Sequence, residues 1–146
     1  MLRSVRAFLP YLALALAAAA FLGCERAEPL ETDDSVSFST IQENVFNSSC
    51  ALSGCHRGPA AAEGLDLSAG NAYENLVGVA SEQVADLDRV DPGNPDDSYL
   101  IIKLEGGDRM ADGSARMPRG REPLSDDQID LIRTWIEDGA PRSPEG

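Results

Sequence analysis

The apolar positions of the chain fall into four groups with helical spacing, and no segment shows the alternation typical of a strand. The first group predicts a helix from about Thr40 to Asn47. Ser39 and Gln42 have the spacing of a capping box at the start of this helix. The helical pattern leads directly into Cys50.

The next two groups predict shorter helices. One is expected from about Gly70 to Val77, where the following Gly78 can end it. Another is expected to start at Pro95, with Asn94 as its cap, and to end at Gly106.

The last group predicts the best-marked helix, in which Ser125 and Gln128 form a capping box and Gly139 follows the final turn. A long loop, Gly107 to Pro123, precedes it and has no helical period. With four helices and no strand expected, the sequence predicts an all-α fold.

The first 23 residues are typical of an export signal, with Arg3 and Arg6 before an apolar stretch. The stretch ends at Gly23 and Cys24, a pattern similar to the cleavage site of bacterial lipoproteins. We therefore expect lipidation at Cys24, which places the protein on the periplasmic side of the cell envelope and anchors it to a membrane. An ordinary cleaved signal and an uncleaved anchor are the alternatives, and all three export the domain.

Residues 24–37 are polar and acidic and predict a flexible tether before a single domain at residues 38–141, with a short tail at 142–146. The domain has few aromatic side chains, so its own core is expected to be thin. They are Phe38, Phe46, Tyr73, Tyr99 and Trp135.

The chain is strongly acidic, with a formal net charge of −13 and a single lysine, Lys103. Such a charge gives the protein little reason to bind nucleic acid. It is explained by solubility, and it also suits attraction to a basic redox partner.

The most informative motif is Cys50-x4-Cys55-His56, which contains the only histidine of the chain. It is a widened form of the C-x-x-C-H motif, in which two thiols bind the vinyl groups of one haem and the histidine becomes the proximal iron ligand. Three alternatives remain: a Cys50–Cys55 disulfide, a zinc site with only three ligands, and a thiol redox pair.

A haem iron bound by His56 needs a sixth ligand, and a methionine sulfur is one that stabilises ferrous iron. Met117 is followed by Pro118, which fixes the local backbone and favours an extended loop. Met117 is the preferred candidate, while Met110 and an open or water-bound position are alternatives. Arg57, Arg116 and Arg119 are candidates to pair with the haem propionates.

Taken together, these segments resemble the single-haem class I cytochrome c domains, and most closely the exported ones with a widened haem motif. The resemblance covers about Phe38 to Pro141. It implies a cytochrome c-like fold around one covalent haem c, thioether bonds at Cys50 and Cys55, and iron ligation by His56 and Met117. The matching segments, in chain order, are the cysteine–histidine motif, Leu65-Asp66-Leu67-Ser68, Asp91-Pro92-Gly93-Asn94-Pro95, Ser98-Tyr99-Leu100, Lys103-Leu104, Met117-Pro118 and the final helix with Trp135.

The function that follows is an exported electron carrier that exchanges single electrons with redox proteins of the envelope, rather than an enzyme. No pair of catalytic acid and base, activated nucleophile or phosphate-binding loop is recognisable in the sequence. Two other functions are kept open. One is a non-redox lipoprotein with a Cys50–Cys55 disulfide that serves as a binding or scaffold module, and the other is a haem sensor with a displaceable Met117.

Overall fold

The computed structural model describes residues 36–110 and 113–142. The chain divides into two units after residue 31, and the described residues all belong to the second unit. The expected signal at residues 1–23, Cys24 and nearly all of the expected tether lie outside the described residues, as do residues 143–146. Within the two described ranges, no helix has the length and hydrophobicity needed to cross a membrane.

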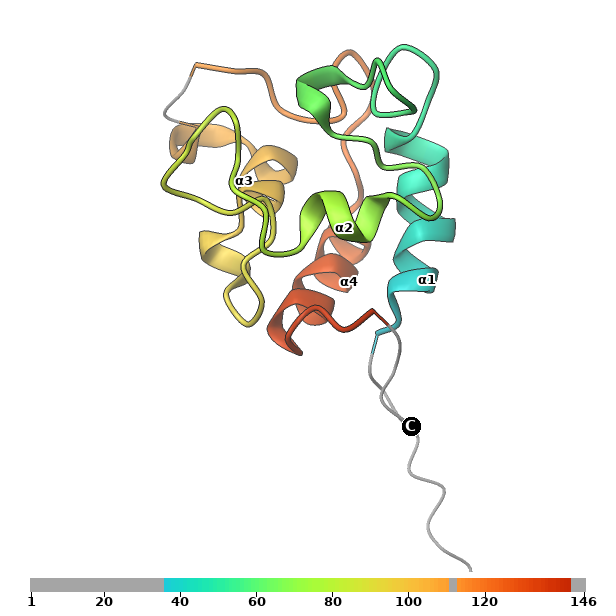
Figure 1. The fold of residues 1–146 in the computed structure, drawn as a ribbon. Coiled ribbons are helices and arrows are strands. Elements are labelled where there is room, and N and C mark those ends of the chain that lie inside the picture. Colours follow the sequence, from blue (N-terminus) through green and yellow to red (C-terminus); the bar gives the residue numbers. More distant parts are fainter. Residues whose placement is uncertain (1–35, 111–112, 143–146) are drawn as a thin grey trace, which may run out of the picture. The chain divides into compact units, whose positions relative to one another are not determined.

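The first helix of the described chain leads to the cysteine–histidine motif. The short α1 (Phe38–Ile41) is followed directly by η1 (Gln42–Cys50), a π-helix (Figure 1). Ser37 caps α1, because its backbone is extended and its hydroxyl accepts a hydrogen bond from the Thr40 N–H at 3.2 Å. The expected capping box of Ser39 and Gln42 is wrong, since Ser39 already lies inside the helix.

The middle of the chain consists of short turns rather than long elements. It contains the 3₁₀ turn η2 (Ala62–Gly64) and α2 (Ala72–Leu76), which is shorter than the expected helix. Among the described residues, β pairing is limited to two isolated bridges, Val77 with Val90 and Ala80 with Asp88. The expectation of an all-α fold is therefore confirmed at the level of class.

The third expected helix divides into two elements, which corrects the prediction that it starts at Pro95. The 3₁₀ turn η3 (Pro95–Asp97) is separated from α3 (Tyr99–Glu105) by Ser98, whose backbone is extended. The Ser98 hydroxyl accepts from the Asp91 N–H at 2.9 Å and donates to the Asn94 carbonyl at 3.0 Å. These bonds to the turn compete with a continuous helix. As expected, Gly106 ends α3, with a φ of 74°.

A final 3₁₀ turn, η4 (Gly107–Arg109), opens the long loop, and α4 (Asp126–Glu137) follows it. The predicted capping box is confirmed: the Ser125 hydroxyl accepts from the Gln128 N–H at 3.3 Å, and the Gln128 side chain accepts from the Ser125 N–H at 3.1 Å. After the helix, Gly139 adopts a φ of 90°, which lets the chain turn away.

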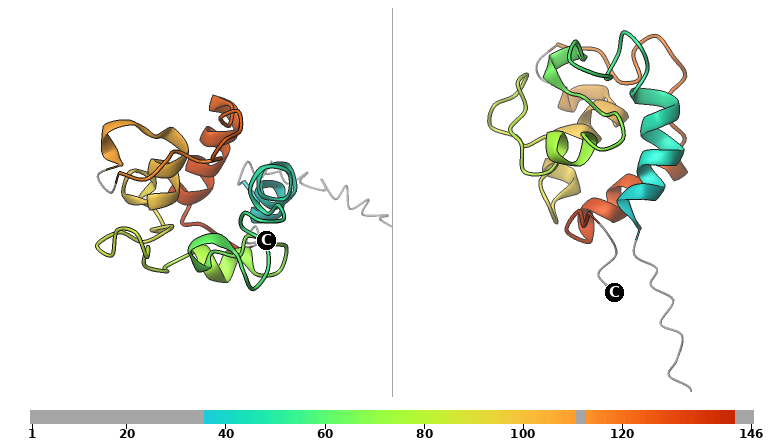
Figure 2. Two further views of the ribbon diagram at one scale, coloured as in Figure 1. Left: turned by 90° about the horizontal axis from the view of Figure 1, so that it is seen from above. Right: turned by 45° about the vertical axis from the view of Figure 1, so that its right-hand side comes forward.

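The core of the second unit is built where α4 contacts α1 and α3 (Figures 1 and 2). Trp135, on α4, and Phe46, on η1, are fully buried. Phe38 joins them, with its ring centroid 5.3 Å from that of Trp135 and 6.1 Å from that of Phe46. The Trp135 indole N–H donates to the Pro141 carbonyl at 2.8 Å, so the chain end is tied to this aromatic cluster.

Candidate functional site

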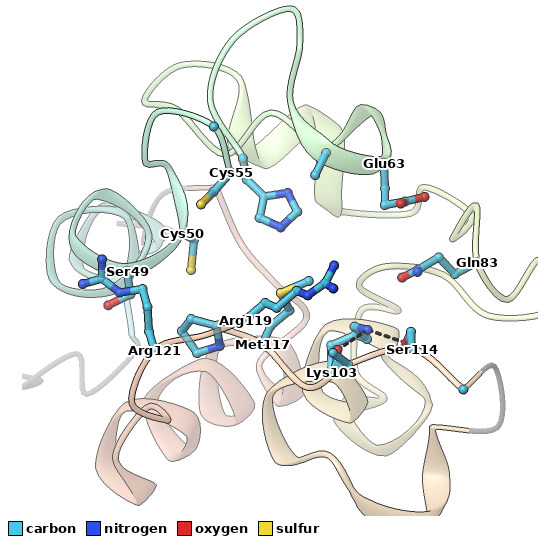
Figure 3. Close-up of a pocket in the computed structure, with 16 residues that line it drawn as sticks. Ser49, Cys50, Cys55, Glu63, Gln83, Lys103, Ser114, Met117, Arg119 and Arg121 are labelled. Carbon is cyan, nitrogen blue, oxygen red and sulfur yellow. Dashed lines mark hydrogen bonds between the residues drawn. The ribbon is translucent and has the colours of Figure 1, made fainter.

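A cavity of about 480 Å³ brings together four residues that the sequence singles out. Cys50, Cys55, His56 and Met117 all line it, although Met117 is far from the other three in the sequence. In Figure 3 the two cysteines lie at one end of the cavity, and Gln83 and Ser114 lie at the other end. The sulfur of Met117 lies between these two ends. The remaining described lining residues are Ser49, Gly54, Ala62, Glu63, Lys103, Gly113, Ala115, Pro118, Arg119 and Arg121.

The four residues between the cysteines form a closed turn. Cys50 is the last residue of η1, and its carbonyl accepts hydrogen bonds from the Leu52 N–H at 2.8 Å and the His56 N–H at 3.2 Å. Gly54 has a φ of 79°, a left-handed conformation that suits glycine at this tight turn. Residues 53–55 are exposed, so the additional residues loop outward while both cysteines remain on the cavity.

The His56 ring is oriented by a backbone carbonyl. Its Nδ1 lies 3.2 Å from the carbonyl oxygen of Leu65. Because that oxygen can only accept, Nδ1 carries the proton of the neutral imidazole, and in that form Nε2 has a lone pair for a metal. The His56 carbonyl accepts from the Leu67 N–H at 2.9 Å, so the segment that orients the ring is itself bound to the histidine.

Arg89 stabilises the backbone just before Leu65 and does not itself line the cavity. It is only 8% exposed, and its guanidinium donates to the carbonyls of Asn75 at 2.9 Å and Glu63 at 3.1 Å. Glu63 has a φ of 54°, a strained conformation for this residue type that Arg89 helps to hold. Sequence reasoning missed Arg89, because no periodic pattern marks an arginine within turns as buried.

Asp66 stabilises the turn that follows it by accepting hydrogen bonds from Ser68 and Asn71. The Ser68 hydroxyl and the Ser68 N–H donate to one carboxylate oxygen at 2.5 and 3.0 Å, and the Asn71 amide donates to the other at 2.8 Å. The bond from the Ser68 side chain, together with backbone bonds from Gly58 and Ser68, holds the pKa of Asp66 well below its usual range. The carboxylate therefore stays ionised at neutral pH and keeps the turn closed.

The Met117 loop is attached to α3 through Lys103. The Met117 N–H donates to the Lys103 carbonyl at 2.8 Å, and the Lys103 ammonium donates to the Ser114 hydroxyl at 2.5 Å and the Ala115 carbonyl at 2.6 Å. Met117 is partly buried against the core. Met110 is not among the described residues that line the cavity. Of the two methionine candidates, the fold brings Met117 to the cysteines and the histidine.

The cationic residues of the site differ from those the sequence suggests. Arg119 lines the cavity as expected, whereas Arg57 and Arg116 are not among its described lining residues. Lys103 and Arg121 line it instead. Lys103 sits in an otherwise apolar helical segment, and that position is the sequence signal for a buried charge.

The environment of Cys50 argues against this residue as the attacking thiol of a redox pair. Burial raises the pKa of Cys50 to about 11, with a further increase from Cys55 that Arg121 opposes. A redox-active attacking thiol requires the opposite shift. Both cysteines are free thiols in this structure.

The zinc alternative also lacks its donor set. Within residues 36–110 and 113–142, no group of three or more His, Cys, Asp or Glu side chains lies close enough together to hold a metal ion. A bare zinc centre would need such a group.

Comparisons with protein-family models, with curated proteins and with solved structures found no match for this chain. The assignment of function therefore depends on the geometry and chemistry of the cavity.

Proposed function

We propose that this chain is a monohaem c-type electron carrier. One observation carries the proposal: a single cavity gathers two thiols, an imidazole with its Nε2 lone pair available and a thioether. These are the side chains that attach haem covalently and fill both axial positions of its iron. In this proposal Cys50 and Cys55 form the thioether bonds, and His56 and Met117 are the axial ligands.

The donor set fits haem c better than the other groups considered. A raised pKa keeps Cys50 a neutral thiol, and addition of a thiol across a vinyl group uses both its sulfur and its proton. The carbonyl of Leu65 fixes the tautomer of the neutral His56 ring, as a hydrogen-bond acceptor behind a metal-bound histidine does. The bond from the Met117 N–H to the Lys103 carbonyl holds the thioether on the cavity wall.

When bound, the haem supplies an iron that gains or loses one electron. The residues of this chain bind and orient the group. A sulfur ligand at Met117 favours the ferrous state relative to a harder donor. With both axial positions taken by side chains, no substrate binds the iron, so the proposed role is electron transfer between redox proteins rather than an enzymatic reaction.

The proposal includes the export and lipidation expected from the sequence. Lipidation at Cys24 would anchor the carrier to a membrane on the periplasmic side of the cell envelope, where haem c is attached. The acidic composition suits an electron carrier with basic protein partners and gives no support to nucleic-acid binding.

The test is expression of the full chain, with its signal, beside a haem c maturation system. We expect a c-type pyridine haemochrome spectrum that survives denaturation and acid–acetone extraction, and an intact mass increased by one haem. The matched control replaces both Cys50 and Cys55 by alanine and should lose the covalent haem.

Colourless protein from a host that matures another c-type cytochrome would overturn the proposal. An intact mass two hydrogens below that of the reduced chain would then favour the disulfide lipoprotein.

A further inference from the structure

The cavity has two chemically different ends. Cys50 and Cys55 lie at one end, while Gln83, Lys103 and Ser114 lie at the other (Figure 3). The first end offers thiols. The second offers an ammonium, a hydroxyl and an amide, which are groups that bind a carboxylate.

Lys103 is the distinctive residue of the second end. It is only 6% exposed and lies in α3 between the buried side chains of Ile102 and Leu104. Burial of an ammonium group is costly unless hydrogen bonds or an opposite charge stabilise it. Its bonds to Ser114 and Ala115 place the charge at the cavity wall rather than in bulk solvent.

The chemistry of haem connects the two ends. In the porphyrin of haem c, the two pyrroles that bind cysteine sulfur form one half of the ring, and the two pyrroles with propionates form the other half. We propose, on the basis of the function proposed above, that Lys103 and the neighbouring Ser114 hydroxyl bind a haem propionate. This assigns the end of the cavity that holds Gln83, Lys103 and Ser114 as the carboxylate-binding end.

Arg119 also lines the cavity and is a second cation for a carboxylate, whereas the remaining cationic residues fit this role less well. Arg121 acts on the Cys50 thiol electrostatically, which places it near the thiol end. Arg57 and Arg116 are not among the described lining residues. In a chain of net charge −13, Lys103 is a buried cation across the cavity from the thiols, and its positive charge suits a carboxylate at that end.

Lys103 is also expected to affect the redox equilibrium. A carboxylate near the iron favours the ferric state, because the negative charge stabilises the more positive metal. An ammonium that neutralises this carboxylate removes part of that preference. Lys103 therefore raises the reduction potential of the bound haem.

The first experiment uses the wild-type holoprotein. Lys103 is the only lysine of the chain, so labelling with ¹⁵Nζ-lysine gives one side-chain signal. With the haem carboxyl carbons labelled by ¹³C, we expect a through-space correlation between that nitrogen and a propionate carbon in the ferrous protein. Covalent haem without this correlation would overturn the inference while leaving the proposed function intact, whereas absence of covalent haem would overturn both.

Three variants provide an independent measurement. Lys103→Gln is expected to keep covalent haem but to shift the propionate bending mode in the resonance Raman spectrum and to lower the reduction potential. Lys103→Arg, which keeps the charge, should retain most of the wild-type potential. Arg142→Gln removes an exposed cation that pairs with Glu74 and should leave the propionate mode unchanged.

Equal propionate modes in the wild-type protein and Lys103→Gln would contradict the assignment. If Lys103→Gln does not fold, the NMR correlation between Lys103 and the propionate in the wild-type protein tests the assignment by itself.

Discussion

His56 and Met117 are held on the cavity by different means, and this difference decides what each contributes. The imidazole follows the second cysteine directly, and its Nδ1 is bound to the Leu65 carbonyl. The thioether depends on a long loop whose contacts with α3 run through Lys103. Met117 is therefore the residue whose removal should change the iron ligation without preventing haem attachment.

We expect Met117→Ala to keep covalent haem and to become high-spin or solvent-ligated, because the loop then offers no sulfur at the cavity. Met110→Ala is the matched control and should keep the low-spin spectrum, since Met110 is not among the described residues lining the cavity. Absorption and electron paramagnetic resonance spectra of the purified ferric proteins distinguish the two variants. A low-spin spectrum in Met117→Ala, equal to that of the wild type, would remove Met117 from the proposed ligand set.

Asp66 makes the stability of the histidine segment depend on pH. Its pKa is lowered in the folded protein, so the unfolded chain takes up a proton at a higher pH than the folded protein does. The contribution of Asp66 is therefore fully present above the ordinary pKa of about 3.9 and is lost as the pH falls through the folded value. Asp66→Asn should be less stable than the wild type at neutral pH and should lose less stability between neutral pH and acid.

Urea unfolding at a series of pH values measures this effect. Asp86→Asn removes the same formal charge at an exposed position and should keep the pH dependence of the wild-type protein. Parallel stability curves for Asp66→Asn and the wild type, offset by a constant amount, would contradict the proposed linkage.

At the level of elements, the sequence prediction and the structure differ at the start of the first helix. The sequence favours Ser39 as the cap, whereas the structure has Ser37 in that position, bonded to the Thr40 N–H. Ser37→Ala should lower the free energy of unfolding by about 1 kcal/mol, and Ser39→Ala by less than about 0.5 kcal/mol. Chemical denaturation of both variants tests the difference, and the reverse order would favour the cap expected from sequence.

The elements that the sequence predicts well are those with strong local signals. The last helix has a capping box at Ser125 and a glycine after its end, and both appear as expected. The helix expected from Pro95 was divided because Ser98 bonds to Asp91 and Asn94, contacts that depend on how the turn folds. The local residue types do not predict whether Ser98 bonds to the turn or continues the helix.

The candidate site likewise contains residues that local sequence patterns reveal and residues that they do not. The neighbouring motif residues Cys50, Cys55 and His56 are recognisable from spacing alone, and Met117 is recognisable from its Pro118 neighbour. The contributions of Arg89 and Lys103 depend on burial and on contacts with distant carbonyls. Sequence periodicity marks Lys103 as a charge within an apolar helical segment, but it does not reveal the carbonyls that either side chain contacts and gives no sign that Arg89 is buried.

At the scale of the whole described unit, the aromatic cluster and the cavity are built from different kinds of structure. The cluster joins two helices, α1 and α4, through Phe38 and Trp135. The cavity is lined largely by turns and loops, including parts of residues 53–63 and 113–121. Loops with few regular hydrogen bonds open at lower free energy than packed helices. Haem attachment should therefore stabilise the loops more than the helices.

The double variant Cys50→Ala/Cys55→Ala tests this at the scale of the molecule. Relative to the holoprotein, we expect faster amide hydrogen exchange in residues 53–63 and 113–121 and a smaller change in Asp126–Glu137, the helix that carries Trp135. The physical reason is linkage, because a group bound only by the folded site stabilises the segments that contact it. Ser39→Ala, with its cysteines intact, serves as a control for the general effect of substitution. Uniform acceleration across loops and α4 would show instead that the second unit unfolds as one cooperative body when haem is not attached, with no independent stability at the aromatic cluster.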